Sequence, residues 1–154
     1  MKARTRARCI ALQVLYEVDM TGHPPERALD ERLAAESIKK KNIGEFSKKI
    51  VFGVLPIVNH LDDFIAQHAP EWPMDQVAAI DRNILRIALW EFAVTGQTPI
   101  KVAINEAVEL AKVYGSDSAP RFVNGVLGGL AERQNEIKQS IKVLVEDLSS
   151  GPRS

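Results

Sequence analysis

The 154-residue sequence has little of several features that indicate particular classes of protein. It has one cysteine, Cys9, so an internal disulfide is excluded, which fits a reducing compartment. The longest apolar run, residues 50–58, is far shorter than the roughly 20 residues that a membrane span requires. The basic start is not followed by the unbroken apolar stretch of a secretory signal, because Gln13 interrupts it. We therefore expect a cytoplasmic protein with no membrane segment.

Residues that bind metals or carry catalysis are also few and scattered. The histidines stand at positions 23, 60 and 68, whereas metal ligands on one helix are typically three or four residues apart. Cys9 has no histidine near it in the sequence. The glycines of residues 125–129 follow no strand and precede no Gly-Lys-Ser/Thr, so they are not a phosphate loop. We expect no metal, no cofactor and no enzymatic activity.

Strand patterns are missing too, whereas helical spacing of apolar residues recurs along the whole chain. This spacing predicts helices over about residues 4–20, 26–40, 75–95, 100–114, 119–132 and 137–148, and a long apolar stripe over 46–65. Pro56 lies inside that stripe and predicts a kink or a break. Two prolines within residues 69–73 predict an internal boundary. We divide this all-α chain into an N-terminal helical subdomain (1–69), a C-terminal one (70–133) and a helical extension (134–154).

The charge of the chain is balanced overall but lopsided at its start. Basic and acidic residues number 20 each, yet Lys2, Arg4, Arg6 and Arg8 fall within the first eight positions and no acid precedes Glu17. Cations are poorly placed at the N-terminus of a helix, where the dipole end is positive. We therefore expect either that at least part of this run is an arm or that the helix carries a local electrostatic cost for another purpose. It is either an ordinary solvated terminus or a phosphate-binding element, since arginine pairs bidentately with phosphate.

A second unusual feature is an aromatic residue away from the apolar face of its helix. Phe122 lies roughly 90° from the face that carries Val123, Val126, Leu127 and Leu130, because successive helical residues turn about 100°. Gly125 and Gly129 lie on its side of the helix, although each glycine costs ~1 kcal/mol relative to alanine. Phe122 either belongs to a wide buried face or is a stacking platform for an unpaired base. Tyr16 is either a second such ring or a core residue.

Three separated motifs resemble the bacterial transcription antitermination factor family NusB. They are Arg-Thr-Arg-Ala-Arg at residues 4–8 with Ala-Leu-Gln-Val-Leu-Tyr at 11–16; Ile-Leu-Arg-Ile-Ala-Leu-Trp-Glu at 84–91; and Lys-Val-Ala-Ile-Asn-Glu-Ala-Val-Glu-Leu-Ala-Lys at 101–112, followed by Tyr-Gly at 114–115 and Phe-Val-Asn-Gly-Val-Leu at 122–127. The resemblance covers about residues 2–132, in the family's order.

The resemblance implies an all-helical fold of two packed helical subdomains. It also implies binding to the single-stranded boxA segment of nascent ribosomal or phage RNA, together with the ribosomal protein NusE, in a complex on RNA polymerase. Carried over residue by residue, it places RNA contacts at Arg4, Arg6, Arg8, Tyr16, Arg86 and Phe122, with Asp81 and Ser118 nearby.

This sequence departs from the family pattern at several points. Thr5 interrupts a run in which relatives often have adjacent arginines, which removes one phosphate contact. Ser118 replaces an acid of relatives, a change that should not weaken RNA binding. Residues after Arg133 lie beyond the family core, so the resemblance assigns them no role. A chain with no net charge should bind RNA weakly alone and more tightly beside a second RNA-binding protein.

Two other classes of function are weighed against this one. The first is a helical adaptor that binds only protein, in which the glycine face and the stripe of residues 137–148 would be docking surfaces. The second is an RNA-modifying enzyme, because some RNA cytosine methyltransferases carry a NusB-like domain. Such enzymes need a separate Rossmann-like domain of roughly 200 residues with a glycine-rich cofactor loop, and the sequence contains neither. The sequence leaves open whether the protein is a monomer or a homodimer.

Overall fold

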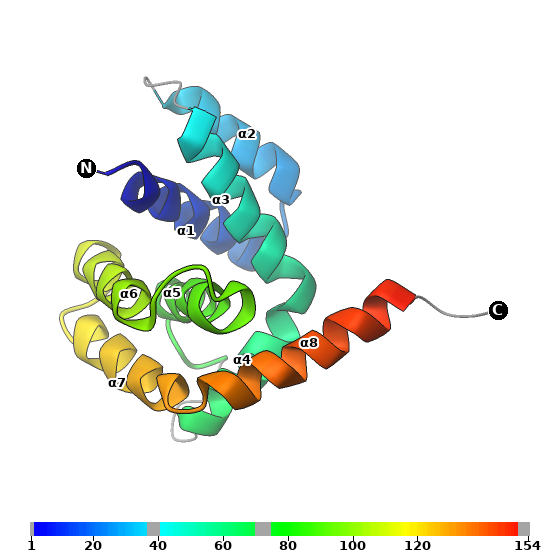
Figure 1. The fold of residues 1–154 in the computed structure, drawn as a ribbon. Coiled ribbons are helices and arrows are strands. Elements are labelled where there is room, and N and C mark those ends of the chain that lie inside the picture. Colours follow the sequence, from blue (N-terminus) through cyan, green and yellow to red (C-terminus); the bar gives the residue numbers. More distant parts are fainter. Residues whose placement is uncertain (1, 37–40, 70–74, 151–154) are drawn as a thin grey trace.

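The computed structural model describes residues 2–36, 41–69 and 75–150 (Figure 1). Its elements are α1 (Ala3–Thr21), α2 (Pro25–Ala35), α3 (Lys41–Val54), the 3₁₀ turn η1 (Leu55–Ile57), α4 (Val58–His68), α5 (Ala79–Leu89), the π-helical turn η2 (Trp90–Thr95), α6 (Ile100–Tyr114), α7 (Ala119–Ala131) and α8 (Gln134–Ser150). No strand occurs among the residues described. The prediction of an all-α fold is confirmed.

The start of the chain is helical, so of the two expectations for the basic run the arm is wrong. α1 begins at Ala3, and Arg4, Arg6 and Arg8 all lie in its first two turns. The run therefore carries the electrostatic cost of cations at a helix N-terminus. Carboxylates near Arg6 and Arg8 and the Phe46 ring near Arg4 offset this cost.

Glycine and proline residues set several of the helix boundaries. α1 ends at Gly22 and η2 ends at Gly96, both with positive φ (73° and 64°), which glycine adopts without strain. The predicted break at Pro56 is confirmed, because η1 separates α3 from α4. α2 ends at Ala35, five residues earlier than predicted. The predicted boundary at residues 69–73 lies largely outside the described residues.

The stretch Asn42–His68 is long and apolar enough to cross a membrane by length and mean hydropathy alone. The structure shows that η1 interrupts it and that it folds back onto the rest of the protein. Its apolar stripe, including Ile50, Val54, Leu61 and Ile65, is buried in the core. We interpret the stretch as two core helices.

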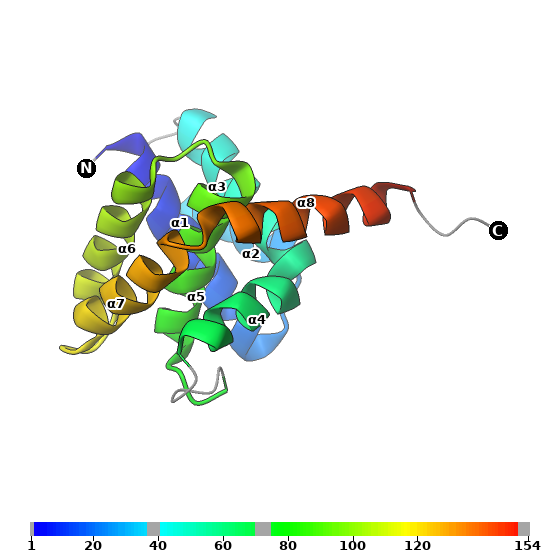
Figure 2. The same cartoon turned by 60° about the horizontal axis from the view of Figure 1, so that its bottom comes forward.

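The helices form two packed groups with a continuous core. α1, α2 and α3 pack together, as do α5, α6 and α7, and α1 joins the groups by packing on α5 (Figures 1 and 2). α4 packs on α5 and α7, and α8 packs on η2 before projecting from the body. The largest fully buried side chains come from both groups: Phe92, Ile10, Leu12, Leu15, Ile50, Leu61, Ile65, Ile84, Leu85, Ile87, Leu89 and Leu127. This core holds the surface elements described next in fixed positions.

Candidate nucleic-acid interface

Arg8 is an interior residue that joins α1 to η2. Its Nε and Nη2 donate to the Glu91 carboxylate at 2.9 and 2.7 Å, and the two side chains are only 3% and 2% exposed. Thr98 donates to the same carboxylate at 2.9 Å, and Glu106 lies 3.5 Å from the Arg8 guanidinium. The donors of Arg8 are thus buried against carboxylates in the free protein, and its contact with RNA stays a prediction.

Arg86 is committed in a similar way. Its guanidinium donates to both oxygens of Asp62 on α4, at 2.8 and 2.7 Å, and to Asp19 on α1 at 3.2 Å. Burial tends to raise the pKa of Asp19, but hydrogen bonds from Arg82 and Asn83 and nearby guanidinium charge outweigh this and lower it. Arg86 therefore holds three helices together, and its contact with RNA stays a prediction.

Arg6 and Arg4 are more exposed than Arg8, and only Arg6 of these two forms an ion pair with a described residue. Arg6 forms an ion pair with Glu36, and this hydrogen bond lowers the pKa of the carboxyl. Arg4 forms no ion pair with any residue in the described part of the chain, and its guanidinium carbon lies 4.6 Å from the centroid of the Phe46 ring. Of the three N-terminal arginines, only Arg4 presents a guanidinium that no carboxylate occupies.

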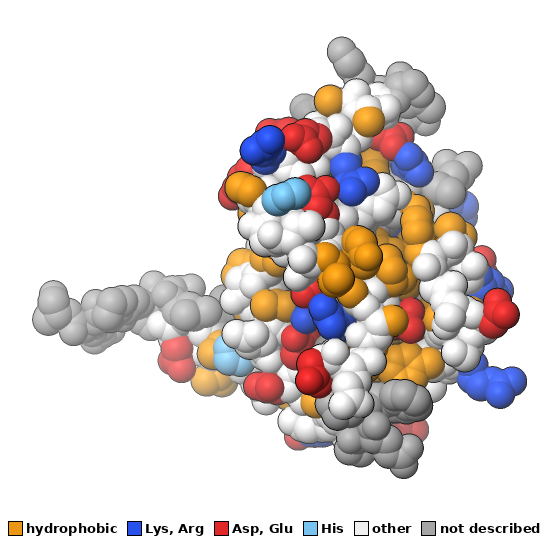
Figure 3. Space-filling view, turned by 180° about the vertical axis from the view of Figure 1, so that it is seen from behind, with side chains coloured by type: hydrophobic (Ala, Val, Ile, Leu, Met, Phe, Trp, Pro, Cys, Tyr) orange, Lys and Arg blue, Asp and Glu red, His pale blue; other side chains and the backbone are white. Residues whose placement is uncertain are grey.

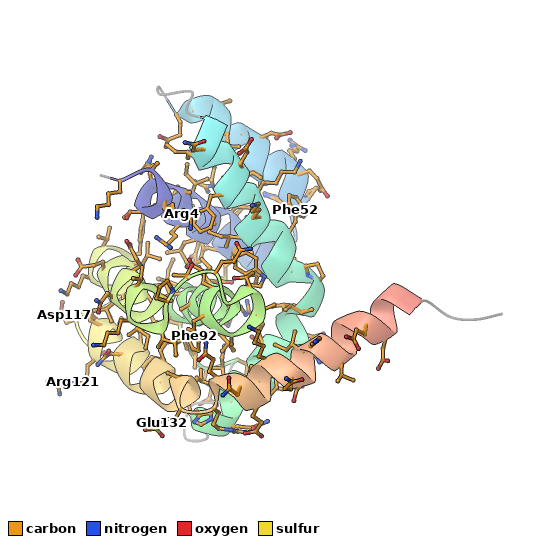
Figure 4. All side chains as sticks on the ribbon, viewed as in Figure 1. Arg4, Phe52, Phe92, Asp117, Arg121 and Glu132 are labelled. Atoms are coloured by element: carbon orange, nitrogen blue, oxygen red, sulfur yellow. The ribbon has the colours of Figure 1, made fainter. Side chains whose placement is uncertain are left out.

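A pocket of about 300 Å³ lies where the starts of α5 and α7 meet. It is lined by Gln76, Val77, Ala78, Asp81, Ser118, Arg121 and Phe122, and we call it the α5–α7 pocket. The structure thus brings together Asp81, Ser118 and Phe122, three of the residues that the resemblance places near RNA. Figure 4 shows Arg121 projecting outward near the start of α7.

Asp81 is a largely buried carboxylate at the edge of this pocket. The residue is 8% exposed, and its Oδ1 has no hydrogen-bond partner among the described residues. This oxygen is itself inaccessible to solvent and faces Gly115, where an added Cβ would lie 3.1 Å from it. Burial raises the pKa of the Asp81 carboxyl.

Arg121 is a candidate that sequence analysis missed. It is exposed, it lines the α5–α7 pocket, and it forms no ion pair within residues 2–36, 41–69 and 75–150. Its position directly before Phe122 in the sequence could have indicated it, because neighbouring residues place a cation close to the Phe122 ring. Arg121 supplies here the positive charge that was expected from the N-terminal run.

Phe122 is half-buried and packs against the core, as the interpretation of a wide buried face requires. Its role as a stacking platform for a base stays a prediction. The neighbouring glycines differ from each other. A Cβ on Gly129 would lie 3.0 Å from Nδ1 of His68, so close packing of α4 explains this glycine. A Cβ on Gly125 would meet nothing within 4 Å. Only Gly125 leaves open space on the Phe122 side of α7.

The structure does not place the N-terminal cations and Phe122 in one pocket. Arg8 bonds Glu91 in η2, directly after α5, whereas Asp81 lies ten residues earlier in the first turn of α5, about 15 Å away along the helix axis. Tyr16 is 38% exposed and lies one turn before Asp19, which bonds Arg82. Tyr16 is therefore at the same end of the α1–α5 pair as the α5–α7 pocket, but it does not line that pocket.

The surface between these two regions does not favour a phosphate backbone. A groove of about 540 Å³ runs between α1 and α6, with apolar walls that include Val102, Leu110 and Val113 and with carboxylates at Glu106 and Glu109. The face seen from behind carries hydrophobic side chains near its middle, with acidic and basic side chains interspersed (Figure 3). Positive charge available to RNA is thus concentrated at separate points rather than spread over one surface.

Comparison with known proteins identifies the family. The NusB family matches residues 5–132. The transcription antitermination protein NusB of Roseiflexus castenholzii is 48% identical, over 86% of this chain and 94% of its own, and that of Bacillus pumilus is 40% identical, over 90% and 99%. The structure resembles Thermotoga maritima NusB, with 28% identity, a TM-score of 0.74 and coverage of 88% and 90%.

A second solved structure contains antitermination factors NusB and NusE in complex with double-stranded RNA. The matching chain there is 28% identical, with a TM-score of 0.77 and coverage of 91% of this chain and 98% of that one. A matched segment of 128 residues in a chain of 154 and relatives above 40% identity over most of their length leave no ambiguity. This chain belongs to the NusB family.

Proposed function

We propose that this protein is a cytoplasmic, RNA-binding transcription antitermination factor. It binds the boxA segment of nascent ribosomal RNA together with NusE, within a complex on RNA polymerase. The names of its relatives and the solved complex of NusB, NusE and RNA support this proposal. The role is one of binding rather than catalysis.

The observation that carries the proposal is the composition of the α5–α7 pocket. Phe122 offers a partly exposed ring on which an unpaired base stacks, and Arg121 offers an unpaired guanidinium for a phosphate. The Asp81 carboxylate lines the pocket and is an acceptor for an amino group on a base edge, and Ser118 offers a hydroxyl. A ring, a cation, a carboxylate and a hydroxyl in one pocket suit a nucleotide.

The first turn of α1 supplies additional, sequence-independent attraction to the phosphate backbone. Arg4 carries most of this role, because Arg6 is paired and Arg8 is buried. With no net charge, the chain alone should bind RNA weakly. NusE raises the affinity because two proteins on one strand act as linked binding modules.

A titration of boxA RNA in a gel-shift assay, with and without NusE, tests the proposal. Replacing Phe122 with alanine should weaken RNA binding by about 1–3 kcal/mol, the range measured for one base–aromatic stack. Arg121→Ala should weaken binding and flatten its salt dependence. Arg27→Ala on α2 is the matched control, because it removes an exposed arginine far along the chain from the pocket and should change nothing.

The alternative function is an adaptor that binds only protein. Under that alternative, the wild-type chain binds NusE but no RNA, and Phe122→Ala has no effect on any RNA titration. A Phe122→Ala variant that keeps the wild-type melting temperature and the wild-type RNA affinity would contradict the proposed role of the pocket.

A further inference from the structure

A second, smaller pocket lies between the first turn of α1 and α3, and its lining differs from that of the α5–α7 pocket. It encloses about 260 Å³ and is lined by Ala3, Arg4, Asn42, Glu45, Phe46 and Lys49. The four residues from α3 stand at helical spacing of three and four, so they share one face of that helix. We call this the α1–α3 pocket.

Arg4 has a defined position in this pocket. Its guanidinium carbon lies 4.6 Å from the centroid of the Phe46 ring, and the buried Arg8 lies 5.3 Å from the same ring. A guanidinium stacked on a ring keeps its N–H donors free at its edge. Figure 4 shows Arg4 where α1 meets α3. The ring therefore positions Arg4 for bidentate hydrogen bonding before any ligand arrives.

The two cations that line the α1–α3 pocket have no acidic partner among the described residues, unlike most arginines elsewhere in the chain. Within the part of the chain that the structure describes, Arg4 and Lys49, which line this pocket, form no ion pair. Carboxylates hold most of the other arginines, namely Arg6, Arg8, Arg27, Arg32, Arg82, Arg86 and Arg133. The pocket thus has two cations without an ion pair among the described residues, together with the carboxylate of Glu45.

We propose that the α1–α3 pocket binds a phosphate of the RNA backbone outside the segment that contacts Phe122. Arg4 and Lys49 donate to the phosphate oxygens, and the Asn42 amide provides a further donor. This inference rests on the proposed function, since the ligand is the same RNA. It extends the RNA-binding surface to α3, to which the family resemblance assigned no contact.

The separation of the two pockets sets the length of RNA required. Arg4 lies one turn before Arg8, and Arg8 bonds Glu91 about 15 Å along the helix axis from Asp81, so the pockets are roughly 20 Å apart along this direction. At about 3.4 Å per nucleotide of a stacked strand, on the order of six further nucleotides are needed. RNA that only fills the α5–α7 pocket should therefore be insensitive to changes in the α1–α3 pocket.

Glu45 provides a test of opposite sign, because its carboxylate lines the same pocket. A phosphate that enters the pocket is repelled by this charge. Replacing Glu45 with glutamine keeps the size of the side chain and removes the charge. Binding of long RNA should tighten in this variant and weaken in Lys49→Ala, which a general loss of folding cannot produce.

The experiment measures the affinity of the full chain for boxA RNA of minimal length and for the same RNA extended by eight nucleotides at either end, over a range of sodium chloride concentrations. Lys49→Ala should weaken binding of one extended RNA and reduce its salt slope by about 0.7, the value for one phosphate of a single strand. It should leave the minimal RNA unchanged. Lys142→Ala, an exposed lysine on α8, is the matched control.

The outcomes separate this inference from the proposed function. If the wild-type chain binds the minimal RNA but Lys49→Ala and Glu45→Gln match the wild type on every extended RNA, the α1–α3 pocket is not a phosphate site and the proposed function stands. If Lys49→Ala weakens minimal and extended RNA equally, the assignment to a flanking phosphate is overturned. If the wild-type chain binds none of these RNAs, with or without NusE, both fail.

Discussion

The Arg8 guanidinium and the Glu91 carboxylate form a two-point hydrogen-bonded ion pair in the interior, with donor–acceptor distances of 2.9 and 2.7 Å. The residues are 83 positions apart, so the pair fastens the first helix of the chain to η2. Arg8 therefore stabilises the fold and is not one of the surface cations of the basic N-terminal run.

Removal of Arg8 should therefore reduce stability. Arg8→Ala leaves the Glu91 charge buried without its partner, and we expect a loss of about 3–5 kcal/mol in the free energy of unfolding, measured by urea denaturation. The exposed pair of Arg27 and Glu31 is the control, and Arg27→Ala should change stability by less than about 0.5 kcal/mol. An Arg8→Ala variant that unfolds at the wild-type urea concentration would contradict a structural role.

Asp81 should affect stability and RNA binding in opposite directions. Its pKa is raised in the folded state, so the native protein favours the protonated form, and this contribution to stability is lost as the pH rises from the unfolded value of about 4 through the folded value. Asp81→Asn removes the buried charge. The variant should be more stable than the wild type at pH 7 and equal to it near pH 3, in thermal melts across pH.

The same substitution should weaken RNA binding, because an amide oxygen is a poorer acceptor than a carboxylate and the amide adds a donor that faces the ligand. Gel-shift titrations with boxA RNA check this at neutral pH. A variant that is both less stable than the wild type at pH 7 and unchanged in RNA affinity would show that Asp81 has a purely structural role.

Gly125 tests whether a ligand approaches α7 on the Phe122 side. Apart from the local backbone, no atom of the described residues lies within 4 Å of a Cβ built there, and the same holds for Gly128, which lies on another side of the helix. Each change to alanine should therefore stabilise the free protein by up to ~1 kcal/mol. Gly125→Ala should also weaken RNA binding, whereas Gly128→Ala should not. Equal RNA affinities for the two variants would argue against close approach at Gly125.

Much of the fold follows from local rules, which is why sequence analysis predicted it. Apolar spacing placed the helices, Pro56 divided the long stripe, and Gly22 and Gly96 ended their helices. The roles of individual arginines could not be predicted in this way. Whether Arg8 or Arg86 is free depends on carboxylates supplied by distant segments, namely Glu91, Asp62 and Asp19.

The candidate site shows the same division. Phe122 was identified because its position relative to one helical face can be read from local spacing. Its grouping with Asp81 and Arg121 needed the packing of α5 against α7, and the separation from Arg4 needed the antiparallel packing of α1 on α5. The division into segments 1–69, 70–133 and 134–154 remains a prediction, although α4 packs on α5 and α7.

The most direct test of the central claim is a map of amide chemical-shift changes in the ¹⁵N-labelled protein as boxA RNA is added. The α5–α7 pocket predicts the largest changes within residues 76–81 and 118–125, with smaller ones in the first turn of α1. Changes confined to α2 or α8, with none at residues 118–125, would contradict the claim that the RNA binds beside Phe122.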